Sequence, residues 1–305
     1  MVAMKVSVVI PTKDRPNELK ECIEALLKQT HPIDELVIVD GSTSEEISNE
    51  IKKFISGIRI PCIYIRQREG GLARARNIGA RYAQGDIVVY VDDDVILGND
   101  WVEKAVKTFK KYNKVGGLGG EVLAPVEKKA LLFSKVSKIW SYLFLRDSIK
   151  KGSVTIAGHL TTHPNKLSFV EWLGTSAVAY KKDVLKEFKF DERLELAAPY
   201  AYYDDFDFSY RVGRKYKLLF NPELKAVHRA SRIRLDQFKL NRAKILNHYY
   251  IVKKYRFNVL AFWWSTFGLL LAHIILLLVR PSKANYMALA GLIDGIKKIV
   301  KGGWI

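Results

Sequence analysis

The chain has 305 residues with 50 Lys and Arg against 32 Asp and Glu, a formal net charge of +18. This length suits one large α/β domain with an appendage, and the charge favours polyanions or anionic surfaces, such as nucleic acid, lipid head groups or nucleotide sugars. The two cysteines, Cys22 and Cys62, have neither CxxC nor His-flanked spacing, which excludes a disulfide framework and a zinc motif. The N-terminal residues do not have the pattern of a signal peptide.

A βαβ unit is predicted at the start of the chain. Val6–Ile10 is a β-branched run stopped by Pro11, a segment of helical period follows, and residues 36–40 form the next predicted strand. Strand, helix and strand in this order imply a parallel sheet. Asp40 ends the second strand, where it is placed to take a ribose hydroxyl or a base edge. The first strand is not followed by a GxGxxG loop, which counts against a dehydrogenase.

A helix that begins at glycines follows the third predicted strand, residues 60–65. Gly70 and Gly71 open this helix, and Arg74 and Arg76 lie in its first turns. Backbone amides and guanidinium groups together would suit a bound diphosphate. An ordinary surface helix is the alternative.

Three neighbouring acids end the next predicted strand, within residues 86–95. Asp92, Asp93 and Asp94 repel one another, so a positive group is expected beside them. At the carboxyl end of a parallel strand, where open α/β sheets bind ligands, a divalent cation on Asp92 and Asp94 is the natural candidate. A solvated acidic turn is the alternative.

A basic amphipathic helix is predicted over residues 129–146. It has an apolar stripe and a basic side: Leu132, Phe133, Val136, Ile139, Trp140, Leu143 and Phe144, against Lys135, Lys138 and Arg146. This pattern is typical of a segment in a membrane interface, with packing against the catalytic domain as the alternative.

A membrane-spanning helix is predicted over residues 259–279, which carry no formal charge apart from a titratable His273. A buried core helix is the alternative. Residues 284–300 form either a short second membrane helix or an interfacial one. Because positive charge is densest before Val259, the preceding domain is expected on the cytoplasmic face.

Four motifs occur in order: IPTKDRP, VDGSTSE, GGLARARNIG and VDDDV. Together they resemble the nucleotide-binding half of a family 2 inverting glycosyltransferase of the GT-A fold, over residues 1–235. The resemblance implies a donor pocket, a donor-sugar contact and a site for Mn²⁺ or Mg²⁺. The residues concerned are Pro11, Thr12, Asp14 and Asp40 for the nucleotide, Arg74 or Asn77 near the donor, Asp93 facing the sugar, and Asp92 and Asp94 for the metal.

The same resemblance assigns acceptor and catalytic residues. Trp172, Gly174 and Thr175 fall in a small-residue segment that flanks the acceptor in the family. Asp204 and Asp205 match an acidic pair whose second member is the catalytic base, with Asp in place of the usual Glu at Asp204. An Asp beside another acid in a cleft can acquire the raised pKa that a general base for a sugar hydroxyl needs. A helix N-terminus decorated with acids is the alternative.

A basic run follows His228, which the resemblance makes a third metal ligand or a leaving-group contact. Arg229, Arg232 and Arg242 would hold the released diphosphate. The run resembles the QxxRW segment of cellulose-synthase-like members only in part, because Arg242 is not followed by Trp. A juxtamembrane surface attracted to anionic lipids is an alternative that is compatible with this role.

The predicted fold is therefore α/β, a GT-A domain with a mostly parallel sheet and a C-terminal α-helical membrane segment. Its expected parts are residues 1–235, divided at 120 into nucleotide and acceptor halves, a basic linker at 236–256 and a membrane region at 257–305.

The predicted function is metal-dependent transfer of a sugar, with mannose as one candidate, from a GDP- or UDP-sugar to a lipid-linked polyprenyl or dolichyl glycan. Direct transfer to polyprenyl phosphate is the alternative. A nucleotidyltransferase would carry a Gly-rich, Lys-bearing triphosphate loop after the first strand, and the motif IPTKDRP is not such a loop. A nucleic-acid-binding protein would not need the apolar span, so no nucleic-acid partner is expected.

Overall fold

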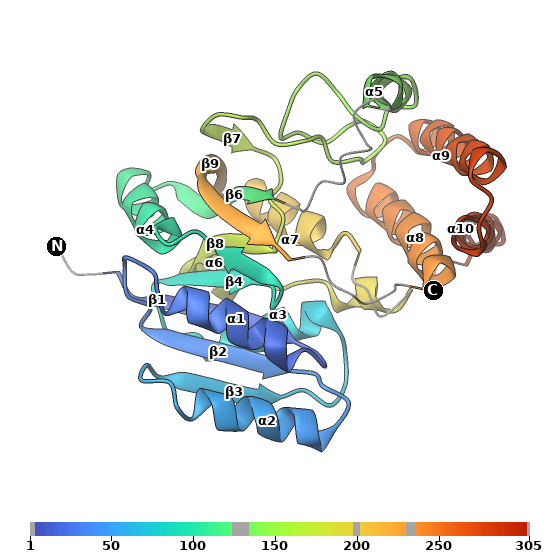
Figure 1. Ribbon diagram of the computed structural model, residues 1–305. Coiled ribbons are helices and arrows are strands. Elements are labelled where there is room, and N and C mark those ends of the chain that lie inside the picture. The colour runs from blue at the N-terminus through green and yellow to red at the C-terminus, as the bar shows by residue number, and fades with distance from the viewer. Residues whose placement is uncertain (1–3, 124–133, 198–201, 230–235, 304–305) are drawn as a thin grey trace. The chain divides into compact units, whose positions relative to one another are not determined.

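The computed structural model describes residues 4–123, 134–197, 202–229 and 236–303 (Figure 1). The chain forms two compact units. The sheet unit comprises Met1–Pro125, Pro164–Asp191 and Phe208–Ser231. The helical unit comprises Val126–His163, Glu192–Asp207 and Arg232–Ile305.

The sheet unit is built on a nine-stranded mixed sheet in the order β3-β2-β1-β4-β8-β6-β9-β5, with β7 also paired to β9. The strands are β1 (Val6–Thr12), β2 (Glu35–Asp40), β3 (Cys62–Arg66), β4 (Ile87–Val91), β5 (Val95–Leu97), β6 (Val115–Leu123), β7 (Ser168–Val170), β8 (Ala177–Lys181) and β9 (Lys217–His228). Strands β1 to β4 pair in parallel, as the βαβ pattern predicts, whereas β8 is antiparallel to both β4 and β6.

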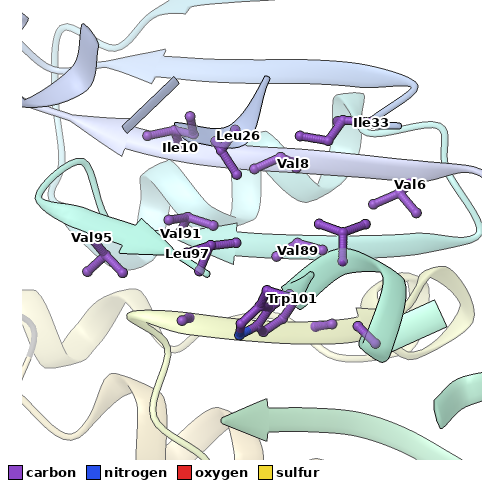
Figure 2. Packing of buried hydrophobic residues seen from close by; sticks show 14 of the residues in the cluster. Val6, Val8, Ile10, Leu26, Ile33, Val89, Val91, Val95, Leu97 and Trp101 are labelled. Carbon is purple, nitrogen blue, oxygen red and sulfur yellow. The ribbon is translucent and has the colours of Figure 1, made fainter. Parts of the chain in front are cut away.

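Helices cover both faces of this sheet, and strands β1 and β4 are therefore buried along their whole length. They are α1 (Pro16–Leu26), α2 (Glu45–Ile55), α3 (Leu72–Tyr82), α4 (Trp101–Lys111), α6 (Lys182–Glu187) and the end of α7 (Asp204–Gly213). Residues of even number in β1, such as Val8 and Ile10, pack with Leu26 of α1 and Trp101 of α4 (Figure 2). On the other face, Gly79 of α3 lies so close to β1 that a Cβ there would be 2.2 Å from Val9 Cγ1.

The helical unit contains α5 (Ser134–Leu143), the short 3-10 helix η2 (Glu192–Glu195), α8 (Gln237–Tyr255), α9 (Val259–Val279) and α10 (Lys283–Val300). Its apolar core joins side chains of the three long helices, including Leu246 of α8, Phe262 of α9 and Leu292 of α10. α9 has the bounds that the sequence predicts, and among the described residues it is the single helix long and apolar enough to cross a membrane.

Two other expectations concern segment boundaries. The interfacial helix expected over residues 129–146 corresponds to α5, and residues 124–133 lie outside the described residues. The domain boundary expected at residue 235 stays a prediction. The structure groups residues 126–163 and 192–207 with the C-terminal helices.

Candidate functional site

The acidic triplet follows β4 at the carboxyl edge of the parallel strands, where the ends of β1 and β2 also lie. Asp93 is 5% exposed, accepts a hydrogen bond from Thr12 Oγ1 at 2.8 Å and pairs with Arg15 Nη1 at 3.1 Å. Burial raises the pKa of the Asp93 carboxyl to about 6, although Arg15 and the Thr12 hydrogen bond oppose this effect. A buried carboxylate at this edge is therefore held by residues of the β1 loop.

Asp94 shares the same arginine and faces a histidine. Arg15 Nη1 lies 2.8 Å from Asp94 Oδ2, and His228 Nε2 lies 3.5 Å from Asp94 Oδ1. The backbone fixes this arrangement, since Val95 of β5 pairs with His228 of β9, and the Arg229 amide donates to the Asp94 carbonyl at 2.7 Å. The structure thus brings two of the three residues predicted to bind the metal, Asp94 and His228, next to each other.

Asp92 points to a different partner. Its Oδ1 lies 3.0 Å from Nη2 of Arg76, a residue of α3 that is only 2% exposed. Over the part of the chain that the structure describes, no cluster of three or more His, Cys, Asp or Glu side chains is arranged to hold a metal ion. Carboxylate oxygen and imidazole nitrogen are nevertheless suitable ligands for Mn²⁺, so Asp94 and His228 fit the predicted cation, and Asp92 would have to leave Arg76 to join them.

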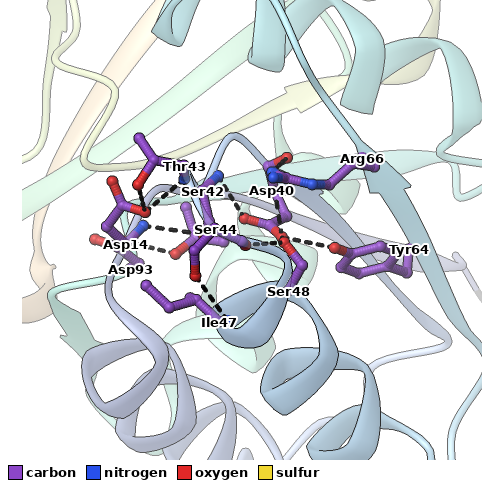
Figure 3. A network of polar contacts seen from close by, with 11 residues as sticks. Asp14, Asp40, Ser42, Thr43, Ser44, Ile47, Ser48, Tyr64, Arg66 and Asp93 are labelled. Carbon is purple, nitrogen blue, oxygen red and sulfur yellow. Dashed lines mark hydrogen bonds and ion pairs between the residues drawn. The ribbon is translucent and has the colours of Figure 1, made fainter.

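Asp40, predicted to contact the nucleotide, is fully buried in a polar network (Figure 3). Its carboxylate accepts hydrogen bonds from Ser42 N and Ser48 Oγ, both at 2.8 Å, and from Tyr64 Oη at 2.6 Å, and Arg66 Nη1 lies 3.7 Å away. Burial favours a higher pKa, but these hydrogen bonds outweigh it and lower the pKa of Asp40 below its usual value. Asp40 therefore orients Tyr64 and Arg66.

Asp14 ties the β1 loop to the β2 loop. Its Oδ1 accepts from Thr43 N at 2.7 Å and Thr43 Oγ1 at 3.0 Å, and its own amide donates to Ser42 Oγ at 3.0 Å. Asp14 adopts a positive φ of 56°, an uncommon conformation that is often found at functional sites. Pro11 is buried within β1.

Two residues of α3 are predicted to lie near the sugar donor. Arg74 is exposed in the first turn of the helix, whereas the side chain of Asn77 is hydrogen-bonded to the main chain. The Asn77 side chain donates to the Phe190 carbonyl at 3.0 Å and accepts from the Phe190 amide at 2.7 Å. The nitrogen and the oxygen of the Asn77 side-chain amide are therefore both bonded within the sheet unit. This favours Arg74 over Asn77 as the residue that contacts the sugar donor.

The predicted acceptor segment directly precedes β8. Thr175 is 4% exposed, and Trp172 and Gly174 are half-buried. The Ser176 carbonyl accepts a hydrogen bond from the Asp92 amide at 3.1 Å, so the segment runs beside the end of β4.

The predicted base lies at the start of α7, within the helical unit. Asp204 is 5% exposed, and Asp205 is half-buried with its Oδ1 accepting from the Phe206 amide at 2.7 Å. Acids in this first turn also complement the helix dipole, as the alternative interpretation holds.

The arginines of the basic run have different neighbours in the structure. Arg229 is largely exposed and lies 3.8 Å from Glu21, whereas Arg242 Nε lies 3.0 Å from Asp294 of α10. Arg232 lies outside the described residues. Diphosphate binding by these arginines stays a prediction.

The sequence analysis missed Arg15, Tyr64 and Arg66. The motif IPTKDRP contains Arg15, and the presence of a cation beside the first strand was the signal that could have paired it with the acidic triplet.

Part of the chain is similar in sequence to known glycosyltransferases. Residues 7–151 match the family described as "Glycosyl transferase family 2". Glycosyltransferase GlyA of Streptococcus pneumoniae is 35% identical over 113 residues, 37% of this chain and 16% of that protein. Glucosyl-dolichyl phosphate glucuronosyltransferase of Haloferax volcanii is 31% identical over 123 residues, 39% of each protein. The chain thus spans well under half the length of these relatives.

Two solved structures share the fold. One is the mannosyltransferase PcManGT from Pyrobaculum calidifontis in complex with GDP-Man and Mn²⁺, with a TM-score of 0.60 and 17% identity over 98% of this chain and 88% of that one. The other is GalNAc-T7 with UDP, GalNAc and Mn²⁺, also with a TM-score of 0.60 and 17% identity, over 82% of this chain and 48% of that one.

Proposed function

We propose that the protein is a metal-dependent, membrane-attached inverting glycosyltransferase, because residues 7–151 match glycosyl transferase family 2 and the chain shares its fold with a solved mannosyltransferase. The observation that carries the proposal is the arrangement of Asp93 and Asp94 with Arg15 and His228 at the carboxyl edge of the sheet. Open α/β sheets bind their ligands at this edge.

Asp94 and His228 would hold Mn²⁺ or Mg²⁺, and the cation would supply positive charge opposite the departing nucleoside diphosphate. Arg15 pairs with both Asp93 and Asp94, so a cation bound to Asp94 would replace part of the positive charge that Arg15 supplies. Arg66, held by Asp40, and Arg74, at the start of α3, are the cations proposed to orient the donor.

Asp205 would take the proton from an acceptor hydroxyl as it attacks the anomeric carbon, which inverts the configuration in one step. Direct transfer to polyprenyl phosphate, the alternative reaction, would not need this base because a phosphate is already ionised. Conversion of Asp205 to Asn separates the two reactions: loss of transfer supports a hydroxyl acceptor, and full activity supports a phosphate acceptor.

A lipid-linked acceptor is supported by two observations. The Haloferax volcanii relative is named for a glucosyl-dolichyl phosphate substrate, and α9 is long and apolar enough to cross a membrane. The basic residues Lys253, Lys254 and Arg256 precede α9, and this favours a catalytic domain on the cytoplasmic face, where nucleotide sugars are made.

The test is donor turnover by the full chain in detergent, with GDP-mannose and a panel of UDP-sugars, in Mn²⁺ and in EDTA. We expect one donor to be consumed, with activity lost in EDTA and reduced at least about 100-fold by Asp94→Ala. The matched control is Asp183→Asn, which removes an exposed acid paired only with Lys186 among the described side chains. Turnover that survives both EDTA and Asp94→Ala would refute the metal site.

A further inference from the structure

One cation of the helical unit has no role in the site described above. Arg146 follows α5 in a tight turn in which its amide donates to the Ser141 carbonyl at 2.7 Å and Leu145 adopts a positive φ of 55°. Phe144, two residues before Arg146, packs so closely on α9 that a Cβ at Gly268 would lie 2.1 Å from Phe144 Cγ. Arg146 is therefore held beside the apolar helix α9.

Among the described residues, no acidic side chain forms an ion pair with the guanidinium of Arg146. Its Nη1 is sealed from solvent and has no hydrogen-bonding partner among the described residues. The adjacent acid, Asp147, is 3.2 Å from Lys151 Nζ. Burial lowers the pKa of Arg146 below its usual value, in keeping with a desolvated charge that lacks an acidic partner. Burial of a charged group without a hydrogen-bonding partner is unfavourable, and a bound anion would relieve this cost.

Three polar rings, those of His159, Tyr203 and His248, interact electrostatically with Arg146. The rings of His159 and His248 lie 4.2 Å apart, and Tyr203 stacks on His248 with centroids 5.3 Å apart. His248 Nε2 donates to the Ala157 carbonyl at 2.8 Å, and burial, with a contribution from the Arg146 charge, lowers the pKa of both imidazoles. Uncharged rings with donor and acceptor atoms can bind an anion, but they cannot neutralise the guanidinium.

Two features show what kind of anion would fit. Burial raises the pKa of the Tyr203 hydroxyl, the Arg146 charge opposes this rise and the Asp205 charge adds to it, so the guanidinium and the proposed base both act on this hydroxyl. An exposed apolar surface lies next to them on α5 and α9, where Leu143 is 58% and Trp264 45% exposed, and Trp264 Nε1 donates to the Leu143 carbonyl at 2.9 Å. The site thus combines an unpaired cation with a surface for an apolar chain.

We propose that Arg146 binds the phosphate group of a lipid-linked acceptor whose hydrocarbon chain lies along the exposed apolar residues of α5 and α9. A guanidinium can donate two parallel hydrogen bonds to a phosphate, which suits this ligand better than a single-point contact. The proposal rests on the proposed glycosyl transfer and specifies its acceptor.

The test measures binding to the full chain in neutral detergent by isothermal titration calorimetry, without donor. The probes are farnesyl phosphate, farnesol, inorganic phosphate and phosphatidylglycerol. We expect wild-type protein to bind farnesyl phosphate about 10- to 100-fold more tightly than farnesol or inorganic phosphate, and phosphatidylglycerol not to displace it. This comparison needs no variant.

Three variants assign the preference to its residue. Arg146→Gln should lose most of the preference for farnesyl phosphate over farnesol, and Arg146→Lys should keep part of it. Lys151→Gln, which removes a cation five residues further along the same segment, should bind as wild type does. Size-exclusion profiles and melting temperatures confirm that the variants are folded.

Equal binding of farnesyl phosphate by Arg146→Gln and wild type would overturn the proposal, as would binding of inorganic phosphate or phosphatidylglycerol as tight as that of farnesyl phosphate. Donor turnover is measured separately. A protein that consumes donor but shows no Arg146-dependent binding refutes this inference alone, whereas binding without donor turnover refutes the glycosyl transfer.

Discussion

Arg15 holds two of the three neighbouring acids at the end of β4, with Nη1 3.1 Å from Asp93 and 2.8 Å from Asp94. Replacement by Met keeps the apolar stem but leaves two mostly buried carboxylates without their cation. We expect Arg15→Met to lower the free energy of unfolding in EDTA by about 1–3 kcal/mol, the usual effect of losing hydrogen bonds to a charged group. Melting temperature in detergent, followed by tryptophan fluorescence, measures the loss.

Mn²⁺ should restore part of that stability, and should raise the melting temperature of Arg15→Met more than that of wild type, because cation and arginine neutralise the same carboxylates. The control is Lys104→Met, which removes a half-exposed lysine paired with Asp100. Equal melting temperatures of Arg15→Met and wild type in EDTA would contradict the role of Arg15.

Residue contacts of this kind were only partly predictable. The three acids were predicted as site residues from their motif and strand position, and His228 from the family resemblance, whereas Arg15 was missed. The partners of these residues could not be predicted, because Arg15 and Asp93 lie 78 residues apart and meet only through the register that pairs β1 with β4. Asp40 shows the same limit: its place at the end of β2 was predicted, but its saturation by Ser42, Ser48 and Tyr64 depends on three separate segments.

At the scale of elements, α10 packs on α8 through glycines one turn apart. A Cβ at Gly291 would lie 2.2 Å from the Phe238 backbone carbonyl oxygen, whereas at Gly295 it would lie 2.3 Å from Ile245 Cγ2, a side-chain methyl that can move. We expect Gly291→Ala to destabilise the protein by about 1–3 kcal/mol through overpacking, and Gly295→Ala to cost less. Melting temperatures of the two variants test this order, and a larger loss for Gly295→Ala would contradict it.

Two neighbouring buried histidines, His248 of α8 and His159 of the 152–163 segment, predict that the stability of the protein depends on pH. Burial lowers the pKa of His248 from 6.5 to about 4 and that of His159 well below 6.5, and Arg146 and Tyr203 face the same rings. Between pH 4 and 6.5 the unfolded chain binds more protons than the folded chain. The free energy of unfolding therefore rises as the pH increases from about 4 to 6.5. For His248 alone the gain is about 3 kcal/mol.

Melting temperatures between pH 4.5 and 7.5 measure this dependence. His248→Gln retains an amide donor for the Ala157 carbonyl but does not titrate, so its melting temperature should rise less steeply with pH than that of wild type. His31→Gln, at a histidine bonded only to the neighbouring Pro32 carbonyl among the described groups, should keep the wild-type slope. A wild-type slope in His248→Gln would contradict the assignment.

At the scale of the whole molecule, the length and apolarity of α9 predict attachment to a membrane. If this 21-residue helix spans the bilayer, the protein should stay with vesicles through a high-salt wash and be released by detergent. Ile275→Lys, at a residue 49% exposed in α9, should weaken this retention by about 2–4 kcal/mol, while Tyr286→Lys, at an exposed position of α10, should not. Release of wild-type protein by salt would show that attachment is electrostatic only.

The sequence by itself determined the local elements, because their signals are periodic and depend on neighbouring residues. Runs of β-branched residues predicted β1, β2 and β4, uniform apolarity predicted α9, and the order of strands and helices predicted a parallel sheet. Only the tertiary structure decided the antiparallel insertion of β8, the pairing of Asp94 with Arg15 and His228, and the burial of Arg146 Nη1 without a hydrogen-bonding partner in the described part of the chain. Each of these depends on contacts between residues far apart in the chain, which are set by strand register and helix packing and leave no periodic trace in the sequence.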